Sequence, residues 1–423
     1  MVCKPMLKAY PRHSVDISGR EYWEMLSRIF SFYVSNGAAS GDFEQVFREY
    51  IGVPYAVSIP SARLGLFLIF KHFALPEGSE IIISPFTHWS IFSVIKACRL
   101  KPVFVDIDEG TFNIDPREVK KVINKNTKVL ILTHMWGQPC DMDPFLELKK
   151  EFGIKVIEDC AMACGATYKG RQAGSFADAS IFSFGKAKAI ATFGGGMLCT
   201  NDRGIYEEAR RSTAAFRYEH PVALASNLLS SVIANILTRP RVFFLSIYPV
   251  MRAFCLKDPY NPMEQRKDVA IFADSVPEQW KIKMSDLQAV LGMEQLRGLD
   301  AKNRKRMANA QILNEILQGT GGIAIPLAVP GAGHTYLYYA LLVKKRTSLE
   351  DIRKILIRHR VDSQLNELTT AKELAVFGAD SKDYPVFHRV SESLLIIPNG
   401  IYLSRDDARY VGNTVKRALD LVD

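Results

Sequence analysis

The sequence predicts an α/β protein with a mostly parallel sheet covered by helices on both faces, followed by a smaller C-terminal α+β domain. The first observation is that short apolar runs alternate with amphipathic runs between Gly41 and Thr200. The second is that the apolar runs are rich in Val and Ile, which is typical of strands buried on both faces. The third is the length of 423 residues, which suits a large and a small domain. We expect the domains to be 1–260 and 261–423.

The predicted elements of the large domain follow from the spacing of apolar residues. Apolar side chains at Phe43, Val46, Phe47 and Tyr50 have helical spacing. Compact Val- and Ile-rich runs predict strands, and the longer amphipathic runs between them predict helices. In chain order, we expect a helix at 43–50, a strand at 55–59, a helix from Ser61, a strand at 79–84, a helix at 90–100, strands at 101–107 and 128–134, a helix at 143–152, and strands at 154–159, 177–184 and 195–201. Functional side chains should follow the carboxyl ends of these strands.

Residues 223–255 differ from the rest because they are strongly apolar. Two apolar stretches, 223–237 and 242–255, are each too short to span a bilayer as a helix. One interpretation is a buried helical connection or a dimer surface. The alternative is a helical hairpin that lies on a membrane, with headgroup contacts from arginine and lysine. Those contacts would come from Arg239, Arg241, Arg252 and Lys257.

The smaller domain is expected to contain a long amphipathic helix at 285–317, a strand at 336–345 and a last helix near 406–422. That order suits a separate α+β unit. The basic run from Lys302 to Arg306 lies on the long helix. We expect it to form a solvated face, and the alternative is an anion-binding patch.

Composition excludes several classes of protein. The formal charge is 54 − 45 = +9, but the basic residues are scattered and no nucleic-acid-binding motif is present. The N-terminal residues lack the apolar core of a signal peptide. Seven cysteines without metal-type spacing predict reduced thiols in a cytoplasmic protein, and no metal site is expected.

An acid and a lysine stand where the chemistry is expected. Asp159 ends one predicted strand, and Lys188 follows another. A lysine that reacts with a carbonyl must lose its proton, which requires a desolvated or cation-rich pocket. A carboxylate within about 4 Å of a protonated ring nitrogen contributes roughly 4 kcal/mol at an effective dielectric near 20. Taken alone, such a pair is more often structural than catalytic.

The stretch from Val156 to Asp202 resembles a known family. Its matching residues are Glu158-Asp159, Gly165-Ala166, Ser183-Phe184, Lys188, Gly195-Gly196 and Asn201-Asp202. In this spacing they resemble the DegT/DnrJ/EryC1/StrS family of pyridoxal-phosphate (PLP) dependent sugar aminotransferases, which have the fold type I architecture. HMWGQPCDMD at 134–143 is also similar to a motif of that family. The resemblance covers most of Gly41 to Asp300.

The resemblance implies roles for two residues in catalysis. Lys188 would be the lysine that forms the Schiff base with PLP and moves the proton. Asp159 would pair with the pyridine nitrogen. Lys186 is a competing lysine, but its spacing from Ser183 does not fit the family pattern.

The resemblance also implies a cofactor-binding set. Ser61, with the backbone amides of Ser61 and Ala62, would bind the phosphate at the start of a helix, where unsatisfied N–H groups and the helix dipole favour an anion. Ser183 would be the second hydroxyl on the phosphate side. His88 would lie over the cofactor face, with Trp89 as the alternative.

Several positions depart from the family pattern. Met162 stands where the family has a glutamine beside the cofactor hydroxyl, which removes a hydrogen bond of about 0.5–1.5 kcal/mol. The family's Gly-Thr before the phosphate serine is Ile59-Pro60 here. The acidic residue of the Gly-rich turn is missing. Lys281 stands where relatives have an asparagine that reaches the neighbouring subunit's phosphate. These changes weaken the expectation of an ordinary nucleotide-linked keto-sugar.

The function expected from the resemblance is transamination. An amino acid, first of all glutamate, would convert PLP to pyridoxamine phosphate, and a keto or aldehyde carbon of a sugar-like acceptor would then receive the amine. The acceptor would be nucleotide-linked or lipid-linked, and the enzyme would be a cytoplasmic homodimer. A dehydratase is disfavoured because such relatives have a histidine at the position of Lys188. The remaining alternative is a regulatory or membrane-associated protein that has kept the fold and lost catalysis.

Overall fold

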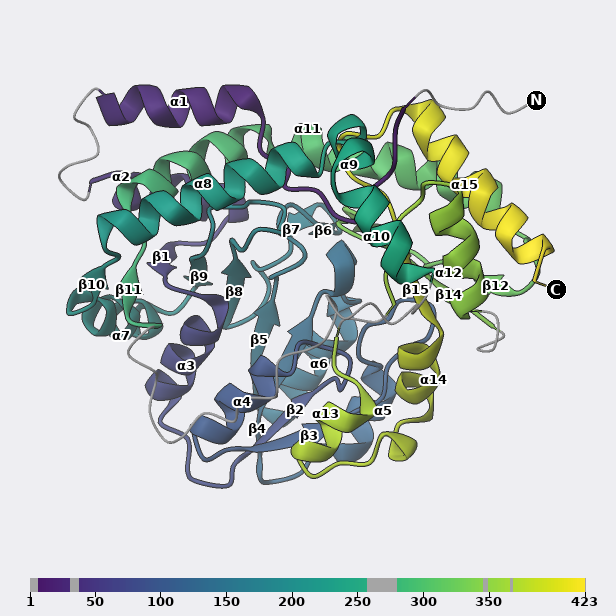
Figure 1. Cartoon of the computed structure of the whole chain (residues 1–423). Helices are drawn as coiled ribbons and strands as arrows, with labels where there is room; N and C mark the ends of the chain where they lie inside the picture. Colours follow the sequence, from purple (N-terminus) through teal and green to yellow (C-terminus); the bar gives the residue numbers. More distant parts are fainter. Residues whose placement is uncertain (1–6, 31–37, 257–279, 345–348, 366–367, 423) are drawn as a thin grey trace.

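A computed structural model describes residues 7–30, 38–256, 280–344, 349–365 and 368–422 (Figure 1). Its centre is a seven-stranded sheet in the order β1-β9-β8-β5-β4-β2-β3. The strands are β1 (Tyr55–Ile59), β2 (Glu80–Ile83), β3 (Lys101–Phe104), β4 (Thr127–Thr133), β5 (Lys155–Asp159), β8 (Ala179–Ser183) and β9 (Gly196–Thr200). Only β9 runs antiparallel to its neighbours. The sheet is therefore mostly parallel, as expected.

Helices and short strands surround this sheet along the chain. The helices before residue 256 are α1 (Gly19–Phe30), α2 (Ala38–Ile51), α3 (Ala62–Phe73), α4 (Ser90–Ala97), α5 (Pro116–Val122), α6 (Met142–Phe152), α7 (Arg203–Ala214), α8 (Pro221–Leu237), α9 (Pro240–Leu245) and α10 (Ile247–Cys255). Two minor sheets pair β6 (Thr167–Tyr168) with β7 (Arg171–Gln172) and β13 (Ala332–Gly333), and β10 (Arg217–Tyr218) with β11 (Ile282–Lys283).

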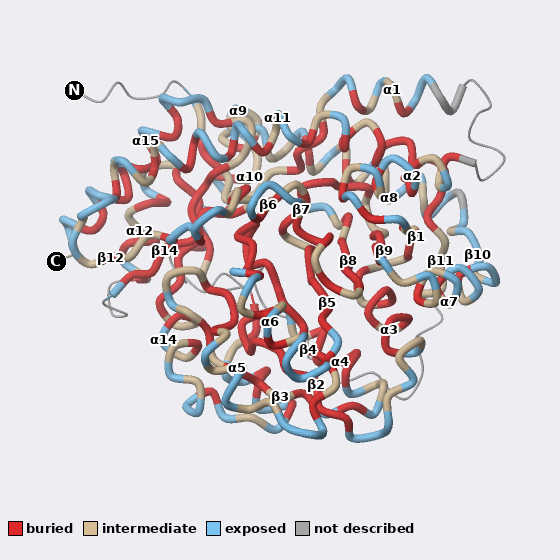
Figure 2. Tube along the Cα trace, turned by 180° about the vertical axis from the view of Figure 1, so that it is seen from behind, coloured by how far each residue is buried: buried red, intermediate tan, exposed pale blue. Residues whose placement is uncertain are grey.

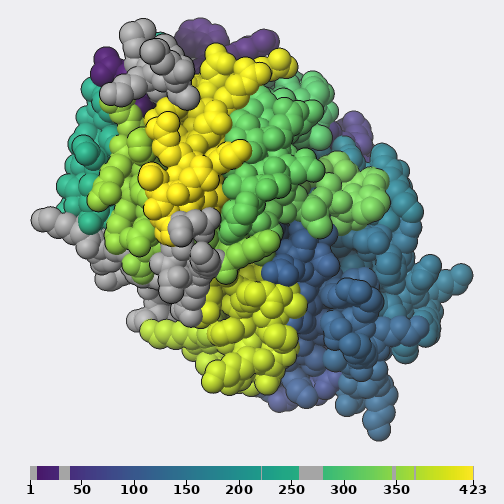
Figure 3. Space-filling model, turned by 90° about the vertical axis from the view of Figure 1, so that its right-hand side faces the viewer, coloured from purple at the N-terminus to yellow at the C-terminus, as the bar shows by residue number. Residues whose placement is uncertain are grey.

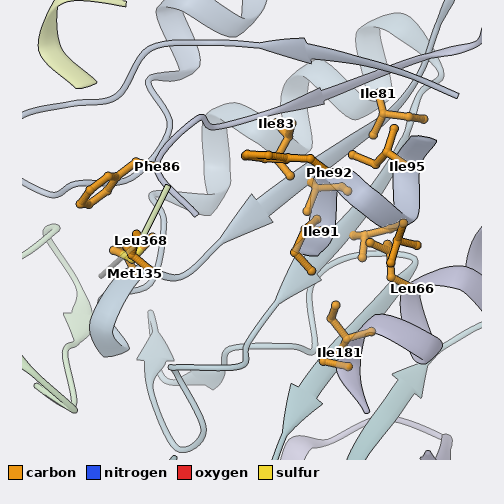
Figure 4. Close-up of a cluster of buried hydrophobic side chains, with 14 of the residues drawn as sticks. Leu66, Ile81, Ile83, Phe86, Ile91, Phe92, Ile95, Met135, Ile181 and Leu368 are labelled. Atoms are coloured by element: carbon orange, nitrogen blue, oxygen red, sulfur yellow. The ribbon is translucent and has the colours of Figure 1, made fainter. Parts of the chain in front are cut away.

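Both faces of the large sheet are covered, because alternate side chains of each strand point to opposite sides. Ile81 and Ile83 of β2 belong to the apolar cluster formed with α3 and α4, and Figure 4 shows them beside Ile91, Phe92 and Ile95 of α4. Ile82, between them, belongs to the cluster formed with α5 and α6. Figure 2 shows these strands as buried. The resulting three layers fix the carboxyl ends of the strands at one edge.

The C-terminal part is built on a small sheet and one long helix. The sheet has the order β12 (Ile323–Ala324), β14 (Tyr339–Val343) and β15 (Leu394–Ile397). The helices are α11 (Asp286–Leu317), α12 (Leu349–Arg358), α13 (Ala371–Val376), α14 (Pro385–Ser393) and α15 (Arg405–Asp420). Leu341 of β14 packs with α11, α12 and α15, which Figure 3 shows side by side in green to yellow. Leu342, on the opposite face, joins the core of the large sheet.

The C-terminal part also contributes directly to the large core, which local patterns did not predict. Leu374 of α13 and Phe387 of α14 pack in the same cluster as β2 and α4. The backbone amides of Val386 and Phe387 donate hydrogen bonds to the Asp106 carboxylate at 2.9 and 2.8 Å. The predicted boundary at 260/261 lies outside the described residues.

One sequence expectation was wrong in part. The run Lys302–Arg306 does not form a uniformly solvated face, because Arg306 is 1% exposed and Asn303 is buried. The Arg306 guanidinium is bound by the Asp16 carboxylate and by Asn303 Oδ1, the latter at 2.7 Å. A buried guanidinium requires such partners, and Asp16 lies far away in the sequence, beyond the reach of a local pattern.

Candidate active site

Asp159 is the last residue of β5 and is almost completely buried. Burial raises the pKa of its carboxyl, while the Ala161 amide and the Lys188 ammonium act in the opposite direction. Its Oδ1 accepts a hydrogen bond from the Ala161 amide at 3.0 Å. Among the described residues, no other hydrogen bond to this carboxylate is present, so the buried acid retains capacity for a cationic partner.

Lys188 lies in the loop that follows β8, the strand next to β5. It is half-buried, and its charge acts on Asp159. Lys186 is exposed, and its ammonium donates a hydrogen bond to Ser230 Oγ of α8 at 2.8 Å. The two lysines therefore differ in environment, and of the two only Lys188 acts on the pKa of the buried acid.

The lysine loop is held in place by side chains from the C-terminal part. Gln295 of α11 binds both backbone groups of Ala191, with its Nε2 2.7 Å from the carbonyl oxygen and its Oε1 3.0 Å from the amide. Gln288 donates to the Thr192 carbonyl at 3.0 Å. Tyr338 Oη donates to the Ala187 carbonyl at 2.7 Å. The position of Lys188 thus depends on α11 and on the segment leading into β14.

A cavity of about 190 Å³ opens beside the N-terminus of α3. Ser61 caps this helix, with its Oγ accepting from the Leu64 amide at 3.4 Å. The turn Phe193–Gly194–Gly195 also lines the cavity, and the Gly195 amide donates a hydrogen bond to the Pro60 carbonyl at 3.1 Å. Gly194 and Gly195 have φ of 142° and 85°. These backbone conformations favour glycine. A Cβ on Gly196 would come within 2.2 Å of the Phe182 carbonyl oxygen, so the backbones here approach closely.

Arg63 lines the same cavity and was missed by the sequence reasoning. Its guanidinium lies 4.3 Å from the ring centroid of Trp280. Burial lowers its pKa, and no carboxylate pairs with it among the described residues. The available signal was a cation two residues after Ser61, at the start of a helix. Glu219 also lines this cavity, but its carboxylate accepts a hydrogen bond from the Asn227 side chain at 3.0 Å and forms no ion pair with Arg63. A largely buried cation without an acid partner favours an anion in the adjacent space.

His134, Glu158 and Cys160 form a compact buried cluster behind Asp159, with potential ligand atoms within 4.8 Å of one another. The Cys140 amide donates to His134 Nδ1 at 3.0 Å, so the proton of the neutral ring lies on Nε2, 3.0 Å from Glu158 Oε2. Glu158 also accepts from three backbone amides, those of Gly174, Phe176 and Ala177. These saturated hydrogen bonds fit a support for β5 better than a metal site.

The other predicted site residues lie in two loops and at the end of β8. His88 is exposed, and its Nδ1 lies 2.8 Å from Ser90 Oγ. Trp89 is half-buried and packs against the core. Met162, half-buried in the turn after Asp159, packs against the same cluster. Ser183 ends β8 and pairs in register with Gly196.

Lys281 is half-buried and immediately precedes β11, which pairs with β10. Its neighbour Lys283 lines the cavity beside Arg63, and the Lys283 ammonium donates to the Ala214 carbonyl at 2.8 Å. Trp280 and Ile282, on either side of Lys281, line the same cavity. The expected contact with a partner's site stays a prediction.

The chemistry of these residues fits both the pyridine ring and the phosphate of PLP. Asp159 would offer a buried carboxylate oxygen to a protonated ring nitrogen. Ser61, the α3 amides and Arg63 would offer hydrogen bonds and positive charge to a phosphate. Lys188, whose charge acts on Asp159, would offer the amine. A mostly parallel α/β sheet with such a set is the arrangement of a PLP-dependent enzyme of fold type I.

The chain belongs to the DegT/DnrJ/EryC1/StrS aminotransferase family, whose model matches residues 22–233 and 248–416. It is 28% identical over 418 residues to the spore coat polysaccharide biosynthesis protein SpsC of Bacillus subtilis, covering 97% of this chain and 96% of SpsC. It is 35% identical over 204 residues to GDP-perosamine synthase of Caulobacter vibrioides, covering 47% of this chain and 55% of that protein. The PMP form of the sugar aminotransferase Spr1654 from Streptococcus pneumoniae has the same fold, with a TM-score of 0.77, 21% identity and 98% of both chains covered.

Replacing Gln295 tests the support of the lysine loop. Gln295→Leu should lower the free energy of unfolding by roughly 1–3 kcal/mol, because it leaves buried backbone groups of Ala191 unpaired. Urea denaturation measures the change. Gln311→Leu, on the exposed side of the same helix, is the control and should change stability by less than about 0.5 kcal/mol. Equal effects of the two substitutions would contradict the support role.

The raised pKa of Asp159 predicts how the cofactor-free protein responds to pH. The folded state binds the proton more tightly than the unfolded state, so stability should fall as pH rises from 3.8 through the higher folded pKa, and stay at the lower level above it. Asp159→Asn should remove this contribution. Urea denaturation of cofactor-free protein at a series of pH values measures it, and parallel curves for both proteins would show that the carboxyl is not shifted.

Proposed function

We propose that this enzyme transfers the amino group of an amino acid, first of all glutamate, to a keto or aldehyde carbon of a sugar or sugar-like acceptor. The observation that carries the proposal is the buried Asp159 carboxylate at the end of β5. Its pKa is raised by burial, and the charge of the half-buried Lys188, which follows the neighbouring strand, acts against this rise. Family membership agrees with this reaction.

Different residues are proposed to transfer the proton, to keep the cofactor ring protonated and to position the lysine loop. Bound PLP supplies an electron sink that makes a proton on the adjacent substrate carbon removable. Lys188 takes that proton and returns it at the neighbouring carbon, acting as general base and general acid. Asp159 stays ionised and keeps the ring nitrogen protonated, which maintains the electron sink. The hydrogen bonds from Gln288, Gln295 and Tyr338 keep the lysine loop in one position.

The phosphate end is proposed to use both expected and additional residues. Ser61 and the amides of Ser61 and Ala62 lie at the N-terminus of α3, and Ser183 lies at the end of β8. Arg63 adds a fixed positive charge beside them. This charge offsets the changes at Ile59 and Pro60, where the family motif is lost. His88 is proposed to cover the cofactor face, with Met162 making its surroundings more apolar.

The acceptor is proposed to be a sugar because named relatives include a GDP-perosamine synthase and a polysaccharide biosynthesis protein. The departures at Met162 and Lys281 favour an acceptor other than an ordinary nucleotide-linked keto-sugar. A lipid-linked sugar fits the apolar segment 223–255. The enzyme is further proposed to be a cytoplasmic homodimer in which Lys281 contacts the phosphate of the partner's site as a point charge.

Substitution of the two lysines tests the assignment of the catalytic residue. Lys188→Ala should abolish the shift in PLP absorption on adding glutamate and lower turnover by roughly 10³-fold or more, because the proton-transfer group is lost. Lys186→Ala should retain both properties, since this side chain bonds to Ser230 on the surface. Stopped-flow absorption measures both. Loss of the shift in Lys186→Ala alone would overturn the assignment.

Arg63 has a separate test in cofactor binding. Arg63→Gln should weaken PLP affinity about 10-fold or more, because a charge-assisted hydrogen bond is lost. Binding of pyridoxal, which lacks the phosphate, should not change. Fluorescence titration of cofactor-free protein measures both affinities, and Arg203→Gln at an exposed site is the control. Equal weakening of PLP and pyridoxal would contradict a phosphate contact.

A further inference from the structure

Helix α8 buries two polar residues and exposes several apolar ones, although its inner side also packs Leu224 and Leu228 against the core. Ser231 and Asn235 are 0% and 1% exposed, whereas Val222 and Leu229 are 70% and 60% exposed. The exposed apolar residues of this helix are Val222, Leu229, Ile233 and Ile236. Their spacing of seven, four and three residues places them along one side of the helix. A helix facing water normally shows the opposite arrangement.

Specific hydrogen bonds fix this orientation. The Asn235 side chain donates to the backbone carbonyls of Val15 and Ile17, the latter at 2.8 Å. Rotating α8 to bury Leu229 would remove these bonds and expose the Asn235 site. The outward position of the apolar residues is therefore imposed by the inner side of the helix.

The next two helices continue the apolar surface. Leu245 of α9 and Val250 and Phe254 of α10 are exposed. The inner sides of the same helices are also apolar, since Phe243 and Met251 are buried with Ala9 and Ile357. Figure 1 shows α8, α9 and α10, in teal, on the outside of the molecule. We call the exposed residues of these three helices the outer apolar face: Val222, Leu229, Ile233, Ile236, Leu245, Val250 and Phe254.

The charge of this segment has one sign. Residues 221–256 contain Arg239, Arg241 and Arg252 and no aspartate or glutamate. All three arginines are exposed. Arginine beside exposed apolar side chains is typical of helices that lie at the surface of an anionic bilayer. A two-fold contact of this segment with itself would bring together arginines without a carboxylate from the segment to pair them.

Part of the segment is absent from the family match. The matched ranges leave out residues 234–247, which hold the end of α8 and all of α9. The family model therefore does not account for this part of the segment. Within the described residues, no helix has both the length and the apolar character to cross a bilayer.

We propose that the outer apolar face binds the surface of an anionic membrane. Leu229, Ile233 and their neighbours enter the boundary between headgroups and acyl chains, and Arg241 and Arg252 contact lipid phosphates. Arg239 is instead directed to Asn235 and to the Tyr402 ring within the protein. The proposal goes beyond transamination and does not depend on it. Since Ser230 of α8 also bonds to Lys186 of the lysine loop, the bound membrane lies near the loop that carries Lys188.

The test is flotation of the PLP-loaded protein with two kinds of vesicle, phosphatidylcholine alone and phosphatidylcholine with an equal part of phosphatidylglycerol. The wild-type protein should float with the anionic vesicles. Leu229→Ser with Ile233→Ser should lower the vesicle-bound fraction roughly 10-fold or more, because two apolar side chains are lost from the contact. Leu421→Ser, at another exposed leucine, should leave it unchanged.

The arginines are tested in the same assay. Arg241→Gln with Arg252→Gln should weaken binding to anionic vesicles, by roughly 5-fold for each arginine at low salt. Wild-type protein that stays at the bottom of the gradient with both vesicles would overturn the proposal. A second result would also overturn the proposal: the Leu229→Ser and Ile233→Ser variant floats normally but sediments as a monomer, whereas the wild type sediments as a dimer. The outer apolar face would then be a contact between two copies of the chain.

Discussion

A carboxylate buried at the end of a strand is costly in free energy unless a cation lies near it, and the placement of Asp159 depends on this constraint. β5 brings the acid to the edge of the sheet, and the His134–Glu158 pair with three backbone amides holds the residue before it in place. The neighbouring strand β8 leads to Lys188, whose charge opposes the upward shift of the Asp159 pKa. The order of the parallel strands therefore places Asp159 and the loop of Lys186 and Lys188 at the same edge of the sheet.

The C-terminal part contacts the loops at the edge of the large sheet that carry the candidate site residues. Its long helix α11 supplies Gln288 and Gln295 to the lysine loop, while the other end of the same helix packs on the small sheet. Thr369 binds the Thr87 carbonyl next to His88. The two parts are thus joined through contacts to the lysine loop and to the loop of His88.

Much of this could be predicted from the sequence, because it depends on local periodicity or on a motif. The strands, the α3 start at Ser61 and the long helix α11 follow from the pattern of apolar residues, and the family resemblance pointed to Lys188 and Asp159. The burial of Arg306, the Arg63–Trp280 contact and the packing of Phe387 on the large sheet could not, because each joins residues far apart in the chain. The orientation of α8 could not be predicted either, because apolar residues occur on all sides of this helix. Its inner side is fixed by the hydrogen bond from Asn235 to Ile17, which lies far away in the sequence.

The central claim is that Lys188, and not Lys186, is the lysine that binds the cofactor. Borohydride reduction of the PLP-loaded protein, followed by digestion and mass spectrometry, tests it most directly. The account predicts that the reduced cofactor is attached to the side chain of Lys188. Attachment to Lys186, or no attachment at saturating PLP, would contradict it.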